Sequence, residues 1–514
     1  MALLIVGAVA TIKLYQSTTE NEQSGDSDSS RYVASQETYL AMYEPVTFNV
    51  LRSKEEDVVY LNQLVYSSLF RLDETLNIVP DLVSSYSMEP ESGVLDISLR
   101  DDAIFSNNMH VTAQDVITTI ETIKEIGQES PYYIYVNRIA DIRINDTYSL
   151  SLRFSNPDIS ALDNLVFPII SDADYTRDQG FAVGSGPYVY GYHNKGEYVR
   201  LLPNPFYYGE IPTQTIDISI IKDKSAVPGL ITMDAVTAFL SKDQNSDTIA
   251  SDRSLLCKAI PSGELEYLGF NHTNQFLSDS NIRQAMAFAI DRESIINDDY
   301  GRAGTISDSL YFPGFLGSDP EEKIAFEPKT SADLLTSLGM RDMDEDGIIE
   351  NSDGDDMSFR LIVDSSKGNR VDAARSLSED LASIGINVNV APLDKDTFFA
   401  ELQAGNFDLY MAGLKIDKQF NLSELYGPSN YGHYNGEQVI SLTKELEKMH
   451  SQEEQTNIFR DLKQSLYNEV PYFAICYKNY YFLSVTTLDT KTQVMYFDPY
   501  RNIGSWTWQK RDNT

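Results

Sequence analysis

The sequence contains few of the residues that build disulfides, metal sites and catalytic triads. Cys257 and Cys476 are its only cysteines. Both lie in apolar, strand-like runs, which favours two buried free thiols and leaves a disulfide between them as the open alternative. The five histidines are scattered and show no metal-ligand spacing, so we expect neither a zinc site nor a histidine-dependent triad. These histidines are His110, His193, His272, His433 and His450.

Positive charge is scarce as well. The chain has 40 lysine and arginine residues against 77 aspartate and glutamate residues, which gives a formal net charge of −37. Nucleic acids and anionic lipid surfaces attract basic proteins, so this balance argues against nucleic acid as a partner and against electrostatic binding to a membrane. An acidic surface that keeps the protein soluble is the simplest interpretation of the charge.

Catalytic signatures are also missing. The sequence has no G-x-S-x-G nucleophile elbow, no P-loop, no G-x-G-x-x-G turn after a predicted strand and no H-E-x-x-H pair. Carboxylates stand close together throughout so acidic a chain, and a pair of them therefore indicates nothing. We expect a protein that is not an enzyme and that requires no cofactor.

Long apolar runs are confined to the N-terminus. Ala2–Ile12 is apolar but too short to span a bilayer, and it is typical of the hydrophobic region of a signal peptide or anchor, with a short buried helix as the alternative. Gln16–Ser30 is rich in Ser, Asp, Glu, Asn and Gly, which predicts a disordered linker. Residues 1–30 are therefore expected to tether an extracytoplasmic body to the membrane, at the cell surface or in the periplasm.

Apolar and aromatic residues are plentiful. The 514 residues are 42% apolar and 11% aromatic, and 32 of them are tyrosines. A chain of this length is too long for a single core, so several lobes are predicted. The body begins near Arg31, where Tyr39–Met42 and Val46–Leu51 have the pattern of strands.

A hairpin is predicted near residue 190. Tyr188–Tyr192 and Tyr198–Leu202 have the pattern of strands, and the turn residues Asn194, Lys195 and Gly196 separate them. Before the hairpin, the residues at 184 and 186 are glycines, which we expect to supply positive φ for a tight turn.

This hairpin and its flanks resemble the signature of the family 5 extracytoplasmic solute-binding proteins, which serve peptide/nickel-type ABC importers. The family pattern is a G-[ST]-G-P-Y turn, a strand, and then R-N-P-x-Y-[WY]-G. This chain has Gly184–Tyr188 and Pro203–Gly209 at these places, with Pro203 in place of the usual Arg. Other blocks of the chain match the family in order and spacing: Tyr66–Asp73, Pro80–Tyr86, Leu99–Val116, Tyr267–Asn271, Ile282–Ala303 and Val470–Ile475.

The resemblance implies an α/β fold of the periplasmic-binding-protein-like clamshell kind (class II type), with two lobes and an extra inserted subdomain. Lobe I would comprise residues 31–52, 169–266 and 483–514, subdomain II residues 53–168, and lobe III residues 267–482. The β-α-β-α-β order from Phe359 to Met411 independently predicts a parallel sheet in lobe III. The lobes should be joined by strands near Glu266–Phe270 and Ile475–Phe482.

The function implied by the resemblance is that of the substrate-binding component of an ABC transporter. The protein would capture an oligopeptide or dipeptide in the cleft between its lobes and deliver it to permease subunits in the membrane, acting as a monomer. The alternatives are a binder of another solute, such as an oligosaccharide or a nickel chelate, a surface sensor not coupled to import, and an anchored structural protein.

Asp417 is the leading candidate for contact with a peptide. It ends the segment Gly413–Asp417, which lies where peptide binders of the family carry a G-W-x-x-D motif whose Asp takes the peptide α-amino group. Leu414 and Lys415 depart from that motif, and a surface charge on a loop is the alternative. The other candidate ligand-binding residues follow from their position at the ends of motifs, with a buried structural role as the alternative: Tyr43, Tyr267, Asn271, Tyr410, Tyr426 and Tyr477.

A calcium site is predicted in Asp342–Asp353. Carboxylates at positions 1, 3 and 5 with Gly347 at position 6 follow the EF-hand loop pattern, in which oxygen ligands surround a hard cation. An acidic turn exposed to solvent is the alternative. The expected ligands of this structural calcium are Asp342, Asp344, Asp346, Ile348, Glu350 and Asp353.

Overall fold

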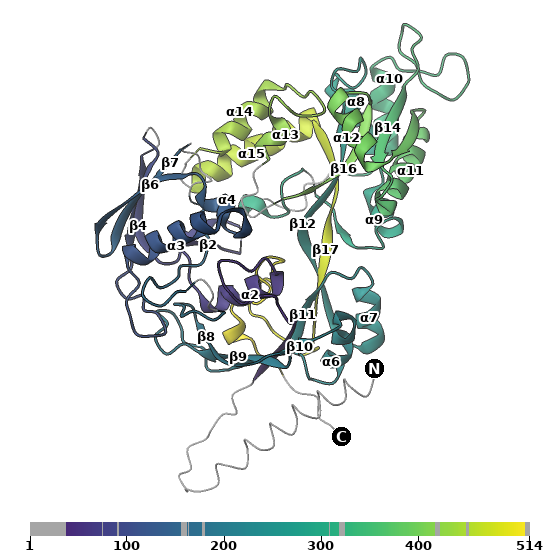
Figure 1. The fold of residues 1–514 in the computed structure, drawn as a ribbon. Helices are drawn as coiled ribbons and strands as arrows, with labels where there is room; N and C mark the ends of the chain where they lie inside the picture. Colours follow the sequence, from purple (N-terminus) through teal and green to yellow (C-terminus); the bar gives the residue numbers. More distant parts are fainter. Residues whose placement is uncertain are drawn as a thin grey trace.

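Two long antiparallel strands connect the two bodies of the molecule (Figure 1). They are β12 (Leu256–Phe270) and β17 (Tyr472–Ser484), which pair from Leu256 opposite Ser484 to Gly269 opposite Tyr472. The structure is a computed structural model, and it describes residues 37–74, 76–89, 92–155, 162, 164–176, 180–307, 309–317, 324–416, 422–448 and 452–508.

Each of these two strands contributes side chains to more than one core. Ile260 of β12 is buried in the first body, whereas Leu268 of the same strand is buried in the second. In the second body the strands alternate between the two faces of a sheet, with Leu268 on one face and Tyr267 on the other. The strands therefore belong to both bodies, in the region where the sequence predicted the connection.

The first body is built on a four-stranded sheet in the order β1-β10-β9-β8. β1 pairs with β10 in parallel, and the other neighbours are antiparallel. The elements of this body are β1 (Thr38–Tyr43), α2 (Glu56–Val65), β8 (Tyr188–Asn194), β9 (Tyr198–Pro203), β10 (Ile216–Ile221), α6 (Val227–Thr232), β11 (Ala238–Ser241) and α7 (Ser246–Arg253).

A separate antiparallel sheet, in the order β4-β5-β7-β6, lies beside α3 and α4 at the side of the first body (Figure 1). α3 begins at Thr112, whose backbone N–H donates to the Asp115 carboxylate at 2.8 Å. The elements are β2 (Phe70–Leu72), β3 (Ile78–Pro80), β4 (Val83–Glu89), β5 (Val94–Leu99), α3 (Ala113–Ile126), α4 (Tyr133–Val136), β6 (Ile139–Asp146) and β7 (Ser149–Phe154).

The second body is a three-layer α/β/α arrangement. It is built on a seven-stranded sheet in the order β11-β17-β12-β16-β14-β15, with β13 paired to β17, and the sheet continues through β17 to β11 in the first body. β14 pairs in parallel with both β15 and β16, as the β-α-β-α-β order predicted. Helices α8 to α11 cover one face, and α12 to α15 cover the other. The elements are α8 (Ser280–Ala289), α9 (Arg292–Asp298), β13 (Gly304–Thr305), α10 (Pro328–Ser337), β14 (Ser358–Asp364), α11 (Gly368–Ala382), β15 (Asn387–Leu393), α12 (Lys395–Ala404), β16 (Leu409–Lys415), α13 (Ser423–Tyr426), α14 (Glu437–Leu446) and α15 (Gln452–Glu469).

The hairpin near residue 190 is present as β8 and β9, but the reason for the glycines before it is different from the one predicted. Neither Gly184 nor Gly186 has a positive φ; Gly196, in the hairpin turn, has φ +77°. A Cβ added at Gly184 would lie 2.0 Å from the carbonyl oxygen of Val65. The glycines before the hairpin are therefore required by close packing against the end of α2, and not by their backbone angles.

Val46–Leu51 is a loop and not a strand, so the prediction for this segment was wrong. The carbonyl of Asn49 accepts hydrogen bonds from the N–H groups of Arg52 at 3.1 Å and Ser53 at 2.9 Å, which forms a turn. Phe48, Val50 and Leu51 are buried in the first core from this loop, and this burial explains an apolar pattern that resembled a strand.

Both cysteines are free thiols, with Cys476 buried and Cys257 partly exposed. Among the described residues, no helix is both long enough and apolar enough to span a bilayer. The predicted anchor Ala2–Ile12 and linker Gln16–Ser30 lie outside the described residues.

Candidate functional site

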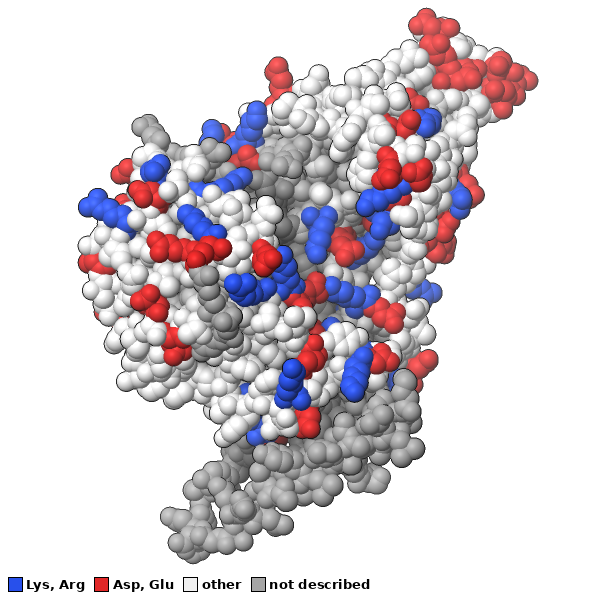
Figure 2. Space-filling view, in the orientation of Figure 1, with Lys and Arg blue, Asp and Glu red and all other residues white. Residues whose placement is uncertain are grey.

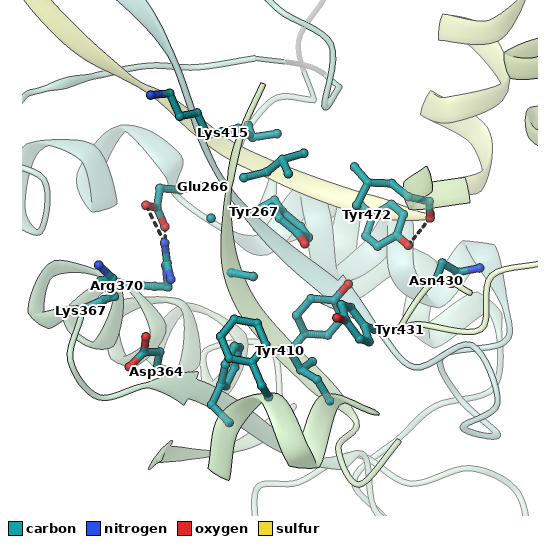
Figure 3. Close-up of a pocket in the computed structure, with 18 of the residues that line it drawn as sticks. Glu266, Tyr267, Asp364, Lys367, Arg370, Tyr410, Lys415, Asn430, Tyr431 and Tyr472 are labelled. Atoms are coloured by element: carbon teal, nitrogen blue, oxygen red, sulfur yellow. Dashed lines mark hydrogen bonds and ion pairs between the residues drawn. The ribbon is translucent and has the colours of Figure 1, made fainter. Parts of the chain in front are cut away.

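A cavity of about 860 Å³ opens in the second body, next to the connecting strands. Its walls are formed by β12, β16 and β17, by the start of α11, by α12 from Lys395 to Leu402, and by the loop after α13 (Figure 3). Figure 3 shows charged side chains on one side of the cavity and tyrosines on the other. The lining includes Glu264, Glu266, Tyr267, Asp364, Lys367, Arg370, Lys395, Phe398, Phe399, Tyr410, Ala412, Gly413, Leu414, Lys415, Tyr431, Tyr472 and Lys478.

The aromatic side consists of tyrosines that pack edge to face. The ring of Tyr267 lies 5.9 Å from that of Tyr410 and 5.8 Å from that of Tyr472, centroid to centroid. The Tyr472 hydroxyl donates to the carbonyl of Leu425 at 2.6 Å, which ties β17 to α13. Burial raises the pKa of Tyr267 to about 12 and also raises the pKa of Tyr410 well above its usual value, so both hydroxyls stay neutral at physiological pH.

The charged side is organised by Glu266, which is buried on β12. Its carboxylate accepts from Nε and Nη2 of Arg370 at 2.6 and 3.0 Å, a bidentate pair between β12 and α11. The ammonium of Lys478 on β17 lies 2.9 Å from the same carboxylate. Three elements therefore supply one buried acid and two bases.

Gly413 on β16 makes room for this ion pair. A Cβ at Gly413 would lie 2.1 Å from Nη2 of Arg370. The guanidinium therefore packs directly on the backbone of β16, and any side chain at this position would displace it.

Beside Gly413, β16 has an unpaired edge. The strand pairs with β12 along its whole length, from Leu409 to Lys415. On its other side it pairs with β14 only from Leu409 to Met411. Ala412–Lys415 has no paired strand on that side among the described residues, and all four residues line the cavity. Backbone N–H and C=O groups at such an edge are available to an extended ligand.

The predicted ligand residues fall into different places. Tyr267 and Tyr410 line the cavity. Asn271 lies just beyond the end of β12, where its side-chain amide donates to the carbonyl of Phe407 at 2.8 Å. Tyr43 is on the first body, where its hydroxyl accepts from the N–H of Lys224 at 3.2 Å.

Three further candidates do not reach the cavity or are not described. Tyr426 is buried behind Tyr472, with ring centroids 5.7 Å apart. Tyr477 is buried on β17, and its hydroxyl donates to the carbonyl of Leu310. Asp417, the predicted anchor for an α-amino group, lies outside the described residues, one position after the last described residue of this segment, Ile416.

The predicted calcium ligands lie in the exposed loop after α10, and Figure 2 shows acidic side chains crowded at that tip of the molecule. Carboxylate oxygens of Asp342, Asp344 and Glu350 come within 4.8 Å of one another. Asp342 accepts from the N–H groups of Glu345 at 2.7 Å and Gly347 at 3.0 Å.

The remaining predicted ligands serve the loop itself. The Asp346 carboxylate accepts from the N–H of Ile348 at 2.8 Å, and the N–H of Asp353 donates to the side chain of Asn351 at 2.9 Å. Neither Asp346 nor Asp353 belongs to the group of three carboxylates that lie close together. Calcium binding by this loop stays a prediction.

No motif in the sequence marks Glu266, Arg370 or Lys478 as a site residue. Glu266 stands next to Tyr267 in a recognised block, and this was the only local signal. Arg370 and Lys478 are more than 100 positions away from it, and only the fold brings the three together.

This architecture, with two bodies joined by long strands and a ligand-sized cavity beside them, is that of a periplasmic-binding-protein-like fold. Residues 77–433 match the model of the bacterial extracellular solute-binding proteins, family 5. The chain belongs to this family, whose members bind solutes for ABC transporters and are not enzymes.

Individual relatives are distant. The oligopeptide-binding protein AppA of Bacillus subtilis is 21% identical over 93% of both chains. The nickel-binding periplasmic protein of Escherichia coli is 20% identical over 82% of this chain and 84% of that protein. Among solved structures, the unliganded open form of the murein tripeptide-binding protein MppA superposes with a TM-score of 0.77 at 15% identity, covering 94% of this chain and 99% of that one. The family rests on the match of residues 77–433, and the structural likeness shows the fold.

Proposed function

We propose that the protein captures extended peptides outside the cytoplasm and hands them to the permease of an ABC importer. The observation that carries this proposal is the unpaired edge of β16 at Ala412–Lys415, which faces an aromatic cavity. A peptide can add to such an edge as a further strand, with its backbone held by hydrogen bonds and its side chains received by pockets.

Two features of the site favour an extended peptide. Gly413 is exposed at the unpaired edge of β16 and lines the cavity, beside the Arg370 guanidinium. Tyr431 and Phe399 are 37% and 44% exposed at the cavity mouth, which offers apolar surface to peptide side chains. Asp417, which follows this edge in sequence, is proposed as the partner of the peptide α-amino group.

The relatives support the same class of ligand. The matching protein with 93% coverage of both chains is named as an oligopeptide-binding protein, and another relative is named as nickel-binding. A nickel chelate and an oligosaccharide are the competing ligands. The N-terminal segment, residues 1–30, is proposed to tether the protein near its permease.

The proposal is tested by mass spectrometry of ligand that co-purifies with the native full-length protein. We expect peptides. A thermal-shift panel of peptides, oligosaccharides and nickel–histidine chelates then ranks the three classes, because a ligand that binds the native state stabilises it. Stabilisation by a sugar or a nickel chelate alone would contradict the proposal.

The role of the β16 edge has its own test. Methylation of the backbone nitrogens of a bound peptide removes N–H donors while keeping its side chains, so we expect N-methylated peptide to bind at least tenfold more weakly, which corresponds to about 1.4 kcal/mol. In the protein, Gly413→Ala should weaken binding because its Cβ meets the Arg370 guanidinium. Gly229→Ala on α6 is the matched control, since the nearest atom to its Cβ would be 3.7 Å away. Equal binding of the methylated and parent peptides would contradict strand addition.

A further inference from the structure

The cavity carries an excess of positive charge in a strongly acidic protein. Five basic and three acidic side chains line it, whereas the whole chain has a formal net charge of −37. Figure 2 shows basic side chains grouped along the hollow between the two bodies. Lysines that gather in one cavity repel one another, and this repulsion is relieved when an anion binds between them.

Two of the three acids of the cavity lie next to a cation, and the third accepts a backbone hydrogen bond. Glu266 is paired with Arg370 and Lys478, and Glu264 lies 3.9 Å from the same Lys478. Asp364 is buried and accepts from the N–H of Ser366 at 2.9 Å. The basic side chains that do not contact Glu266 are therefore the source of the positive charge that faces the cavity.

Three further lysines line the cavity, and with them the five basic side chains outnumber the acidic ones by two: Lys367, Lys395 and Lys415. All three are exposed, and none forms an ion pair with a carboxylate of the described residues. They come from three elements, since Lys367 precedes α11, Lys395 begins α12 and Lys415 ends β16. Figure 3 shows Lys367 and Lys415 on the same side of the cavity as Arg370, opposite Tyr431 and Tyr472.

The start of α11 adds to the positive field. This helix has 15 residues, its N-cap position is Lys367, and no side chain caps its free N–H groups. Its first turn carries no acidic residue. The positive end of the helix dipole is therefore not neutralised by its own side chains where α11 meets the cavity, and it acts in the same sense as the lysines.

We infer that the cavity selects acidic peptides, whose side-chain carboxylates are received by Lys367, Lys395 and Lys415. This inference rests on the proposed function and specifies the ligand for the same site. The apolar part of the peptide would lie on the tyrosine side, and the carboxylates would lie toward the three lysines. Neutral peptides of the same shape would bind more weakly and basic peptides most weakly.

The test is isothermal titration calorimetry of the full-length protein with three matched tetrapeptides, Ala-Glu-Glu-Ala, Ala-Gln-Gln-Ala and Ala-Lys-Lys-Ala. Glu and Gln have nearly the same shape, so their difference isolates charge. We expect the Glu peptide to bind roughly tenfold more tightly than the Gln peptide, from two carboxylates that each contribute about two- to five-fold. Because salt screens exposed charges, this ratio should shrink at high ionic strength.

Variants assign the effect to the lysines. Lys415→Gln and Lys395→Gln should each lower the ratio of Glu-peptide to Gln-peptide affinity about two- to five-fold. Lys329→Gln on α10 is the matched control, because Lys329 is exposed and does not line the cavity. It should leave both affinities unchanged, although it alters the net charge by the same amount.

The outcomes separate the inference from the proposed function. Equal affinity for the Glu and Gln peptides would overturn selection for acidic peptides and leave peptide binding intact. A preference for the Glu peptide that persists unchanged in both lysine variants and in a double variant would also overturn the assignment to these residues. Failure of all three peptides, while a sugar or a nickel chelate stabilises the protein, would overturn peptide binding itself and the inference with it.

Discussion

Two acidic groups in the second body, the Glu266 cluster and the loop Asp342–Asp353, use carboxylates in opposite ways. Glu266 is buried and neutralised by the side chains of Arg370 and Lys478, which come from distant parts of the chain. In the loop, Asp342 is exposed and accepts from backbone N–H groups a few positions away. A carboxylate satisfied by its own loop produces a readable sequence pattern, whereas a carboxylate satisfied across the fold does not.

Removing the buried charge should produce the largest effect. Glu266→Gln keeps the size of the side chain but leaves Arg370 and Lys478 without their anion, so we expect a loss of about 3 kcal/mol in the free energy of unfolding. Urea denaturation measures it. The double variant Glu266→Gln, Arg370→Gln should recover part of the lost stability, because it removes one of the two cations that no longer have a carboxylate partner. If the free energy of unfolding of Glu266→Gln lay within about 0.5 kcal/mol of that of the wild type, the ion pair of Glu266 and Arg370 would behave like an exposed pair.

His272, which is partly buried just after the end of β12, extends the comparison to pH. Burial first, and then the positive charge of Arg283, lower the pKa of His272 to about 4 from 6.5. The unfolded chain binds this proton more readily, so stability is lost as pH falls from about 6.5 to 4, by on the order of 2 kcal/mol. The difference between the stability curves of the wild type and His272→Gln isolates this contribution. If the difference in the free energy of unfolding between the two proteins stayed constant from pH 6.5 to 4, it would contradict this role of His272.

In the loop, Asp342→Asn should have a smaller and local effect. The substitution weakens the two hydrogen bonds that Asp342 accepts from Glu345 and Gly347, at an exposed site, and should cost about 1 kcal/mol. Hydrogen exchange should increase in the loop and stay the same in β12. Faster exchange in β12 as well would show that the two groups are coupled.

Calcium gives the smallest expected change. If the three clustered carboxylates hold the cation, calcium added after chelation stabilises the protein by about 0.4 kcal/mol at a concentration equal to its Kd. Differential scanning calorimetry with and without chelator measures this shift, and Asp344→Asn should abolish it. Asp172→Asn in the first body is the control. No shift at any calcium concentration would leave the loop as an acidic turn held by its own backbone.

The same distinction, between contacts local in sequence and contacts across the fold, explains which parts of the fold were predicted. The hairpin at β8 and β9, the parallel strands of the second body and the two connecting strands were predicted, because each depends on local pattern or on motifs that recur at fixed spacing. The reason why position 184 requires glycine was not predicted, since it depends on contact with Val65, which is more than 100 positions away. The strand prediction for Val46–Leu51 was wrong for a related reason, because apolar residues buried from a loop can have the sequence pattern of a strand.

The site was less accessible to sequence reasoning. Of six predicted tyrosine and asparagine contacts, Tyr267 and Tyr410 line the cavity. With 32 tyrosines in the chain, a position near a motif does not separate a cavity tyrosine from a core tyrosine such as Tyr477. Lys367 and Lys395 lie in no motif, and Lys415 was noted only as a departure from one. Their grouping became visible only when α11, α12 and β16 were placed around one cavity.

The continuity of β12 has a consequence for how the molecule unfolds. Ile260 is embedded in one core and Leu268 in another, on a single strand whose pairing with β17 shifts register between them but resumes on both sides. When either core melts, the strand loses order and the remaining core loses a central element. We therefore expect both bodies to denature in a single cooperative transition, with coincident midpoints for probes placed in each, although the chain has the length of a multi-domain protein.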